Sequence, residues 1–230
     1  MRKNIKDIKE YILTETEDLL AIDKPAGLAV ETKKSGETDL VSLVKKYRYE
    51  KGEDTYAAPI HRIDQVVSGV CLVAKNKETA AYLSNELQNN RVTRIYEAHV
   101  SGVVPDESGE LRDFLYFDKK KNVTVIVPEE KRQQYPSGTV KEAVLSYRRL
   151  SSDGETSVLE IELKTGRHHQ IRCQLANMGH PILGDEKYGG VKTDSTGIEL
   201  VSKSMAFSDG SSFACTTTKT TKHTKISFFP

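Results

Sequence analysis

Strict alternation of apolar and charged residues in the middle of the chain sets the strongest limit on its fold. Leu159, Ile161 and Leu163 alternate with two glutamates and a lysine, so this segment has one buried face and one face in water. Residues 96–100, 123–127 and 143–147 alternate in a similar way. Such half-exposed strands are typical of antiparallel sheets, and the regular strand–helix alternation of a doubly wound sheet is missing. We therefore predict an α+β fold, with a mixed, largely antiparallel sheet and flanking helices.

Three further segments have the spacing of amphipathic helices. Apolar residues recur at i, i+3, i+4 and i+7 from Leu40 to Tyr47, and Asn76 is placed to cap a second helix that runs to Gln88. Apolar residues at positions 171, 175 and 178 indicate a third helix, which starts near residues 166–167 and which Gly179 would end. Continuous apolar runs predict buried strands at residues 19–22 and 70–74. We also expect a last strand at residues 226–229.

The composition places few limits on partners. The chain has 230 residues, of which 29% are charged, and a formal net charge of +1, so it lacks the basic excess of a histone-like binder. Basic residues gather locally in residues 119–132 and 210–230, although each segment taken alone is more typical of a solvated face or tail. No apolar run approaches the roughly 18 residues of a membrane span, and the basic N-terminus lacks the apolar run of a secretory signal. We expect a cytoplasmic protein.

Sequence signatures of common cofactors are missing. There is no GxGxxG, GxxxxGK[ST] or HExxH motif, so no dinucleotide, P-loop or zinc-protease site is predicted. His168 and His169 are adjacent, whereas two zinc ligands on one helical face lie three or four residues apart. Cys71, Cys173 and Cys215 form no CxxC pair, which predicts neither a disulfide framework nor a structural zinc site. We expect a protein that uses neither a cofactor nor a metal ion.

Residues 59–69 form a polar segment that leads into the apolar run at residues 70–74. This segment contains His61, Arg62 and Asp64 within four positions. Loops that feed a buried strand are common places for functional sites, because the strand holds the loop rigidly. On the residues alone, an ordinary surface pair of Arg62 and Asp64 is the simpler explanation.

Residues 165–172 bring several hydrogen-bonding side chains to the expected start of the third helix. Basic side chains at a helix N-terminus oppose the macrodipole, at a cost of about 0.3–1 kcal/mol each. A sequence that accepts this cost often has an anionic partner at that helix end, either a carboxylate or a phosphate. A solvated helix start is the alternative, and spacing alone does not show whether this segment meets residues 59–69.

Together the two segments resemble the RluA family of pseudouridine synthases. The family signature HRLDxxTSGLLxxAK is similar to HRID at residues 61–64 followed by SGVCLVAK at residues 68–75. A second signature, TGRxHQIRxxLAxxGHPIxGDxxYG, matches residues 165–189 throughout. The family's opening strand and turn resemble EDLLAIDKPAGL at residues 17–28, and its K-x-Y-x-A segment resembles RIYEA at residues 94–98. Four signatures in this order are very specific, and the resemblance extends from about residue 14 to residue 190 and more weakly to residue 229.

The chain departs from the family pattern at several positions, none of which removes an expected catalytic residue. Val67 stands in place of threonine and Ile63 in place of leucine. Residues 31–32 replace a His-Pro pair, and LVS at residues 200–202 replaces Leu-His-Ala. We expect no N-terminal S4-type RNA-binding domain of the kind that many relatives carry. We expect residues 1–230 to form a single catalytic domain that acts as a monomer.

The resemblance implies an enzyme that isomerises uridine in ribosomal or transfer RNA, at an active-site cleft across the sheet. It implies that Asp64 is the catalytic carboxylate, that Arg172 is the cation that keeps this carboxylate ionised, and that Tyr96 stacks on the uracil. The other matched residues that we expect to bind the RNA substrate are His61, Arg62, Arg167, His169 and Gln170. Arg62 is further expected to fill or brace the place that the flipped uridine leaves.

Three alternatives make different predictions. An inactive RNA-binding protein of the same fold would not require Asp64. A nucleoside or nucleotide hydrolase would use the same carboxylate but release free uracil. A structural module of the ribosome would bind RNA in a salt-sensitive way without converting any base.

Overall fold

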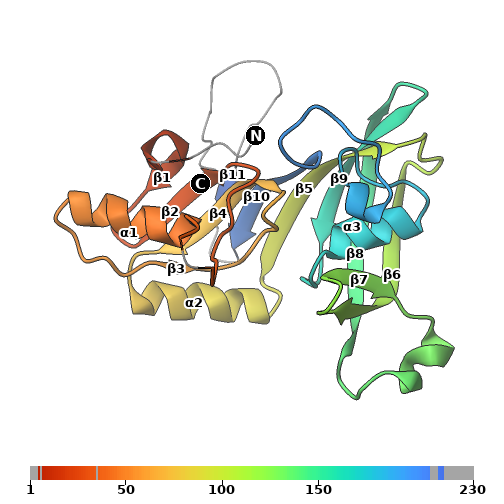
Figure 1. Cartoon of the computed structure of the whole chain (residues 1–230), viewed down its shortest axis with the longest axis horizontal. Helices are drawn as coiled ribbons and strands as arrows, with labels where there is room; N and C mark the ends of the chain where they lie inside the picture. Colours follow the sequence, from red (N-terminus) through yellow and green to blue (C-terminus); the bar gives the residue numbers. More distant parts are fainter. Residues whose placement is uncertain (1–4, 6, 35, 208–211, 215–230) are drawn as a thin grey trace. The chain divides into compact units, whose positions relative to one another are not determined.

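The protein is described by a computed structural model that covers residue 5 and residues 7–34, 36–207 and 212–214. The chain divides into two compact units (Figure 1). Unit 1 comprises Met1–Thr93 and Val201–Pro230, and unit 2 comprises Arg94–Leu200. The expectation that the whole chain acts as a single catalytic domain stays a prediction.

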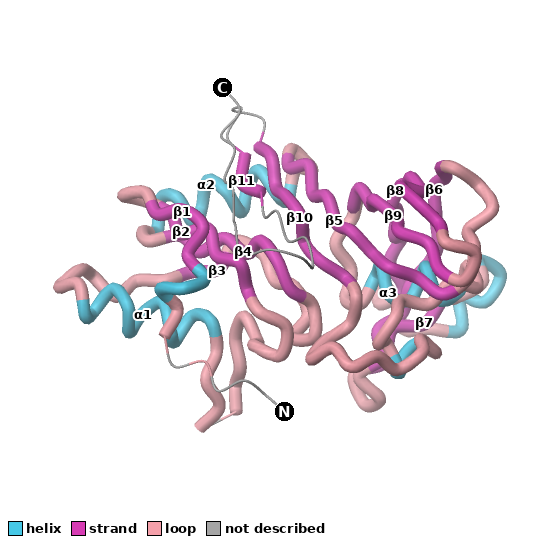
Figure 2. Tube along the Cα trace, turned by 90° about the horizontal axis from the view of Figure 1, so that it is seen from above, coloured by secondary structure: helices cyan, strands magenta, loops and turns pink. Residues whose placement is uncertain are grey.

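Unit 1 is built on an open, mixed sheet. Its strands β1 (Ile12–Glu15), β2 (Leu19–Lys24), β4 (Ser68–Ala74) and β10 (Leu200–Phe207) are neighbours in that order. The short strands β3 (Ala58–Pro59) and β11 (Ser212–Ala214) pair with β4 and β10. The β4–β10 pair is parallel and the other pairs are antiparallel. Two helices, α1 (Leu40–Glu50) and α2 (Lys77–Gln88), lie on opposite sides of these strands (Figure 2).

Strand β4 is buried on both faces, as its continuous apolar run predicts. Val70, Leu72 and Ala74 belong to a core cluster that also contains Leu83 of α2. Cys71 and Val73, whose side chains point to the other face of the strand, are buried as well. The strand is therefore a rigid support for the loop that precedes it.

Unit 2 contains an antiparallel sheet. Its order is β5 (Val92–Ser101), β9 (Thr156–Leu163), β8 (Val140–Ser152), β6 (Ser108–Asp118) and β7 (Val123–Ile126). Helix α3 (Gln170–Asn177) packs on β6 and β7, where Leu115, Ala143 and Cys173 form a small core. Three short 3-10 helices complete the described elements: η1 (Lys9–Tyr11) in unit 1, and η2 (Glu129–Gln134) and η3 (Glu186–Tyr188) in unit 2.

The predicted α+β class with a mixed, largely antiparallel sheet is confirmed, and so is α2. Asn76 caps this helix by accepting the backbone N–H of Thr79 at 2.8 Å. The predicted start of the third helix is wrong, because α3 begins at Gln170, three residues later than residue 167. His169 has a left-handed φ of 50°, which is incompatible with a continuous right-handed helix. The strand expected at residues 226–229, the basic residues of 210–230 and Cys215 lie outside the described residues.

Candidate active site

Asp64 lies in the loop between β3 and β4, where the backbone closes a turn. Its carbonyl oxygen accepts the N–H of Val67 at 3.0 Å. Ile63 and Val67 are buried, whereas the Asp64 side chain is half-buried and Arg62 is exposed. Two apolar anchors therefore fix the loop on either side of Asp64 and keep its carboxylate near the surface of unit 1.

Lys24, at the end of β2, ties this loop to the turn that follows β2. Its side chain is 0% exposed, and its ammonium donates hydrogen bonds to the carbonyl oxygens of Leu28 at 2.7 Å, Pro25 at 3.0 Å and Gln65 at 3.3 Å. Burial lowers the pKa of Lys24 to about 8, although the carboxylate of Asp64 acts in the opposite direction. The residue after Asp64 is thus held by a buried cation.

A second tie joins the same two segments. The N–H of Gly27 donates to the carbonyl oxygen of Gln65 at 2.7 Å, and the Gln65 side-chain amide donates to the carbonyl oxygen of Gly27 at 2.9 Å. Together with the Lys24 contacts, these bonds join the segments at residues 17–28 and 61–75 within unit 1.

His61 is buried at the start of the loop. Its ring nitrogen Nε2 accepts the backbone N–H of Leu72 in β4 at 3.4 Å. This contact supports a role in holding the loop against the strand, and the expected binding of RNA by His61 stays a prediction.

Gly69, next to the start of β4, allows a close approach of two strands. It has a φ of 109°, and a Cβ atom at this position would lie 2.2 Å from the carbonyl oxygen of Ser202 in β10. A side chain would therefore push apart the strands that support the Asp64 loop.

In unit 2, Gln170 organises the segment that precedes α3. Its buried side chain accepts the hydroxyl of Thr165 at 2.8 Å and the backbone N–H of Arg167 at 3.0 Å, and donates to the carbonyl oxygen of Val144 at 3.1 Å. Arg167 is exposed and its Nε donates to the carbonyl oxygen of Glu142 at 2.8 Å. These contacts support a positioning role for Gln170, and leave the expected RNA contacts of both residues as predictions.

Arg94 and Tyr96 lie two positions apart on β5 and therefore share one face of the strand. The Arg94 guanidinium donates to the carbonyl oxygen of Leu163 at 3.0 Å and packs where Gly166 has no side chain. A Cβ atom on Gly166 would lie 2.8 Å from Arg94 Nη1. Tyr96 is buried, with 7% of the residue exposed. Its expected stacking on uracil stays a prediction.

Arg172 forms a buried, two-pronged ion pair with Asp185. Its Nε lies 2.7 Å from Oδ2 and its Nη2 lies 2.8 Å from Oδ1, with side-chain exposures of 5% and 2%. The guanidinium carbon also lies 5.0 Å from the centre of the Tyr188 ring. Asp185 therefore fixes the orientation of Arg172, whose expected effect on Asp64 stays a prediction.

His169 is held neutral beside this pair. Its Nδ1 lies 2.8 Å from the hydroxyl of Tyr188. Burial lowers the pKa of His169 to about 2, and the positive charge of Arg172 acts in the same direction. His169 can therefore offer neutral hydrogen-bonding groups near neutral pH, but no positive charge to a phosphate.

Sequence reasoning missed four residues that organise the site, which are Lys24, Arg94, Asp185 and Tyr188. All four lie inside the matched signatures. Each of them contacts partners that are distant in sequence. A polar or charged residue within an otherwise apolar or glycine-rich run is the sequence signal that could have identified them.

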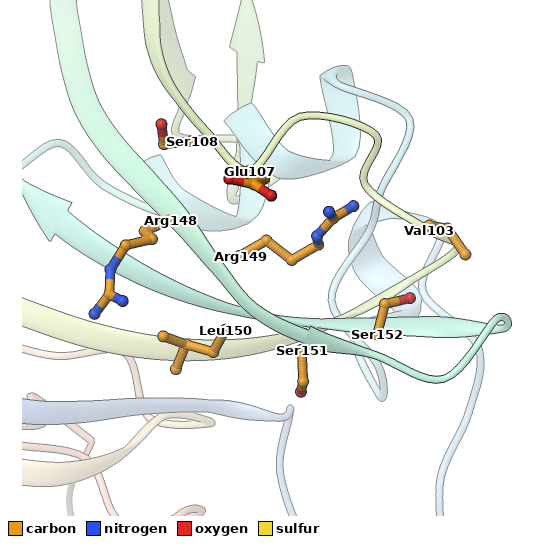
Figure 3. A pocket seen from close by; sticks show the side chains of 8 residues that line it. All are labelled: Val103, Glu107, Ser108, Arg148, Arg149, Leu150, Ser151 and Ser152. Atoms are coloured by element: carbon orange, nitrogen blue, oxygen red, sulfur yellow. The ribbon is translucent and has the colours of Figure 1, made fainter.

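An open hollow of about 720 Å³ occurs elsewhere in unit 2 (Figure 3). It is lined by Val103, Glu107, Ser108, Arg148, Arg149, Leu150, Ser151 and Ser152. None of these belongs to the matched signatures, and the side chains of Arg148 and Arg149 point away from each other. Size alone therefore does not make this hollow the functional site.

Among the described residues, no group of three or more His, Cys, Asp and Glu side chains is arranged to hold a metal ion. In the same part of the chain, no helix has the length and apolar character needed to cross a membrane.

A family model described as RNA pseudouridylate synthase matches residues 18–177. This chain belongs to that family. The match includes Asp64, Tyr96 and Arg172 together with the whole of α3, and it confirms the family predicted from the four signatures.

Relatives of this synthase family occur in bacteria and yeast. An uncharacterized RNA pseudouridine synthase of Bacillus subtilis, YhcT, is 33% identical over 190 residues, which are 80% of this chain and 60% of the relative. Ribosomal large subunit pseudouridine synthase D of Haemophilus ducreyi is 33% identical, over 80% of this chain and 54% of the relative. The tRNA pseudouridine(31) synthase of Saccharomyces cerevisiae is 32% identical, over 77% and 46%. The chain thus spans about half the length of these relatives.

A solved structure supports the pseudouridine synthase fold. Human RNA Pseudouridylate Synthase Domain Containing 4 superimposes with a TM-score of 0.68 at 23% identity, covering 87% of this chain and 85% of that one. At this identity the likeness concerns the fold alone.

Proposed function

We propose that this chain isomerises uridine to pseudouridine in ribosomal RNA, transfer RNA or both, and that Asp64 is its catalytic carboxylate. The observation that carries the proposal is the family match over residues 18–177, because this range includes all three expected catalytic residues. The rigid, half-buried setting of Asp64 supports it, since a reacting carboxylate must be both fixed and accessible.

The proposed reaction rearranges one nucleotide without any external reactant. The bond between C1′ and N1 breaks, a bond between C1′ and C5 forms, C5 loses its proton and N1 gains one, so substrate and product are isomers. Asp64 acts close to the sugar, Arg172 supplies the positive charge that favours an ionised carboxylate, and Tyr96 holds the detached uracil by stacking. Stacking of this kind contributes about 1–3 kcal/mol per base.

The target uridine must leave its own stack to reach Asp64, at a cost of a few kcal/mol. Arg62 is exposed and sits two residues before Asp64. We assign it the role of bracing the place that the uridine leaves. Arg167, an exposed cation, would contact the RNA backbone, while His61, His169 and Gln170 would shape the site from buried positions.

Two relatives support this substrate class: a ribosomal large subunit pseudouridine synthase and a tRNA pseudouridine synthase. We further propose that the chain works in the cytoplasm, as a monomer, with RNA as its partner and without a metal ion or cofactor. Mapping pseudouridine in total RNA from cells with and without the gene would identify the RNA and the position.

Product analysis tests the reaction itself. Purified protein is incubated with unmodified transcripts of ribosomal and transfer RNA, and the digested nucleosides are separated by mass spectrometry. The proposal predicts pseudouridine with no free uracil. Free uracil would identify a hydrolase, and binding without any base change would identify an inactive RNA-binding protein or a structural module.

A further inference from the structure

The turn between β6 and β7 presents three adjacent lysines. Asp118 at the end of β6 accepts the backbone N–H groups of Lys120 at 2.9 Å and Lys121 at 3.1 Å, which fixes the turn. The side chains of Lys119, Lys120 and Lys121 are exposed, and no described residue forms an ion pair with any of them. Their charges are therefore available to a partner.

A fourth cation reaches the same turn from η3. The ammonium of Lys187 donates to the carbonyl oxygen of Asn122 at 3.0 Å. The acidic residues within three positions of these lysines are Asp118, which is engaged with the turn backbone, Asp185, which is paired with Arg172, and the exposed Glu186. The four lysines therefore outnumber the acidic residues that are near them in sequence, although the whole chain is nearly neutral.

A row of rings begins next to the turn. Phe117, the residue before Asp118, stacks on His168 with ring centres 3.8 Å apart, and His168 stacks on His169 at the same distance. His169 then meets Tyr188 edge-on at 5.6 Å. His168 is anchored to β7, because Thr124 donates its hydroxyl to the His168 carbonyl oxygen at 2.7 Å. The row leads from the lysines to the ring that contacts Arg172.

Phe117 forms the outer end of this row. Its side chain is half-buried, and no described ring other than His168 stacks on it. His168 is exposed and occupies the variable position of the TGRxHQIR signature. The stack of Phe117 on His168 is therefore a feature of this chain that the signature does not require.

We propose that Lys119, Lys120, Lys121 and Lys187 together with Phe117 form a binding surface for single-stranded RNA. The lysines contact successive phosphates, and one unpaired base extends the ring row over Phe117. Positive side chains beside a stacking ring suit single strands, because every base has a flat face and every nucleotide a phosphate. An acidic peptide would use the lysines but has no need of the ring. The inference rests on the proposed function, since it assigns this surface to RNA next to the target uridine.

Binding to a labelled single-stranded oligocytidylate tests the surface apart from catalysis, because this probe contains no uridine. The variant K119Q/K120Q/K121Q should lower the slope of log affinity against log salt by about 2, as three lost phosphate contacts on a single strand imply. In about 0.1 M salt its affinity should be roughly 10- to 100-fold weaker. The matched control is K33Q/K45Q/K77Q, which removes three exposed lysines from unit 1 and changes the net charge equally. It should leave the slope within error of wild type.

Phe117→Leu tests the stacking part, because it keeps an apolar side chain and removes the flat ring. Affinity should fall roughly fivefold or more at every salt concentration, with an unchanged slope. Equal effects of the two triple variants, unchanged binding by Phe117→Leu, or equally tight binding of blunt duplex RNA would overturn the proposal. If the binding results hold while no pseudouridine forms, the surface stands and the proposed function falls. If pseudouridine forms but the predicted binding results fail, the RNA-binding surface is refuted and the proposed function is not.

Discussion

Replacing Asp185 with asparagine should destabilise unit 2 by about 3–5 kcal/mol. The side chains of Arg172 and Asp185 are 5% and 2% exposed and are joined by two hydrogen bonds of 2.7 and 2.8 Å. Removing one partner of such a pair leaves a buried charge without compensation, which typically costs about 3–5 kcal/mol. The asparagine preserves the size of the side chain, so the effect reports the charge rather than a cavity.

An exposed ion pair of the same length provides the control. Arg148 Nη2 and Glu160 Oε1 are 2.8 Å apart, but their side chains are 63% and 39% exposed. Glu160→Gln should change the free energy of unfolding by about 0–1 kcal/mol, because water already solvates both charges. The contrast between the two variants isolates burial as the cause.

Urea denaturation followed by circular dichroism measures both effects. With a slope of about 2 kcal/mol per molar urea, Asp185→Asn should lower the midpoint by about 1.5–2.5 M. Pseudouridine formation should fall as well, because Arg172 loses the contact that orients it. The reasoning is refuted if Asp185→Asn is no more destabilising than Glu160→Gln. It is also refuted if the double variant R172M/D185L, which removes both charges, is as unstable as Asp185→Asn.

Three further predictions concern Lys24, His169 and Gly69. Lys24→Met should lower kcat about tenfold or more with little change in KM, because it removes the hydrogen bond that holds Gln65, the residue after Asp64. Because the pKa of Lys24 is about 8, kcat of the wild-type protein should decline above pH 8 in steady-state assays, and the variant should lack this decline. Burial lowers the pKa of His169 to about 2, so below about pH 6.5 this side chain binds a proton in the unfolded state but not in the folded state. The free energy of unfolding should therefore fall by about 1.4 kcal/mol per pH unit towards pH 4. In urea titrations at several pH values, His169→Gln should remove this part of the pH dependence. In thermal melts, Gly69→Ala should destabilise the protein by about 1–3 kcal/mol more than Gly154→Ala. Both glycines have a positive φ, but only at Gly69 does a backbone oxygen lie 2.2 Å from the added Cβ. Equal losses of stability in the two variants would contradict this reasoning.

Short sequence patterns were sufficient to predict the strands and helices that depend on neighbouring residues alone. The continuous apolar run at residues 70–74 predicts the doubly buried strand β4, and Asn76 with its following helical spacing predicts α2. Strand β6 was not predicted, because its burial alternates only weakly and most of its side chains are partly exposed. The start of α3 was also missed, since the Gln170 side chain binds Thr165 and Arg167 and holds them outside the helix.

The same division applies to the candidate site. The signatures identify Asp64, Tyr96 and Arg172 as residues, but not the contacts that hold them. Asp185 lies 13 positions beyond Arg172, and Lys24 reaches a carbonyl oxygen 41 positions away. Pairings over such separations depend on how strands and loops meet in space, and a single sequence contains no direct signal for them.

The rate of pseudouridine formation by wild-type and Asp64→Asn protein, on the same unmodified ribosomal and transfer RNA transcripts, tests the central claim most directly. Carbodiimide modification followed by primer extension locates each pseudouridine, and circular dichroism verifies that both proteins are folded. We predict that the wild-type protein forms pseudouridine at defined positions and that the folded variant forms none. Equal rates for the two proteins would contradict the assignment of Asp64 as the catalytic carboxylate.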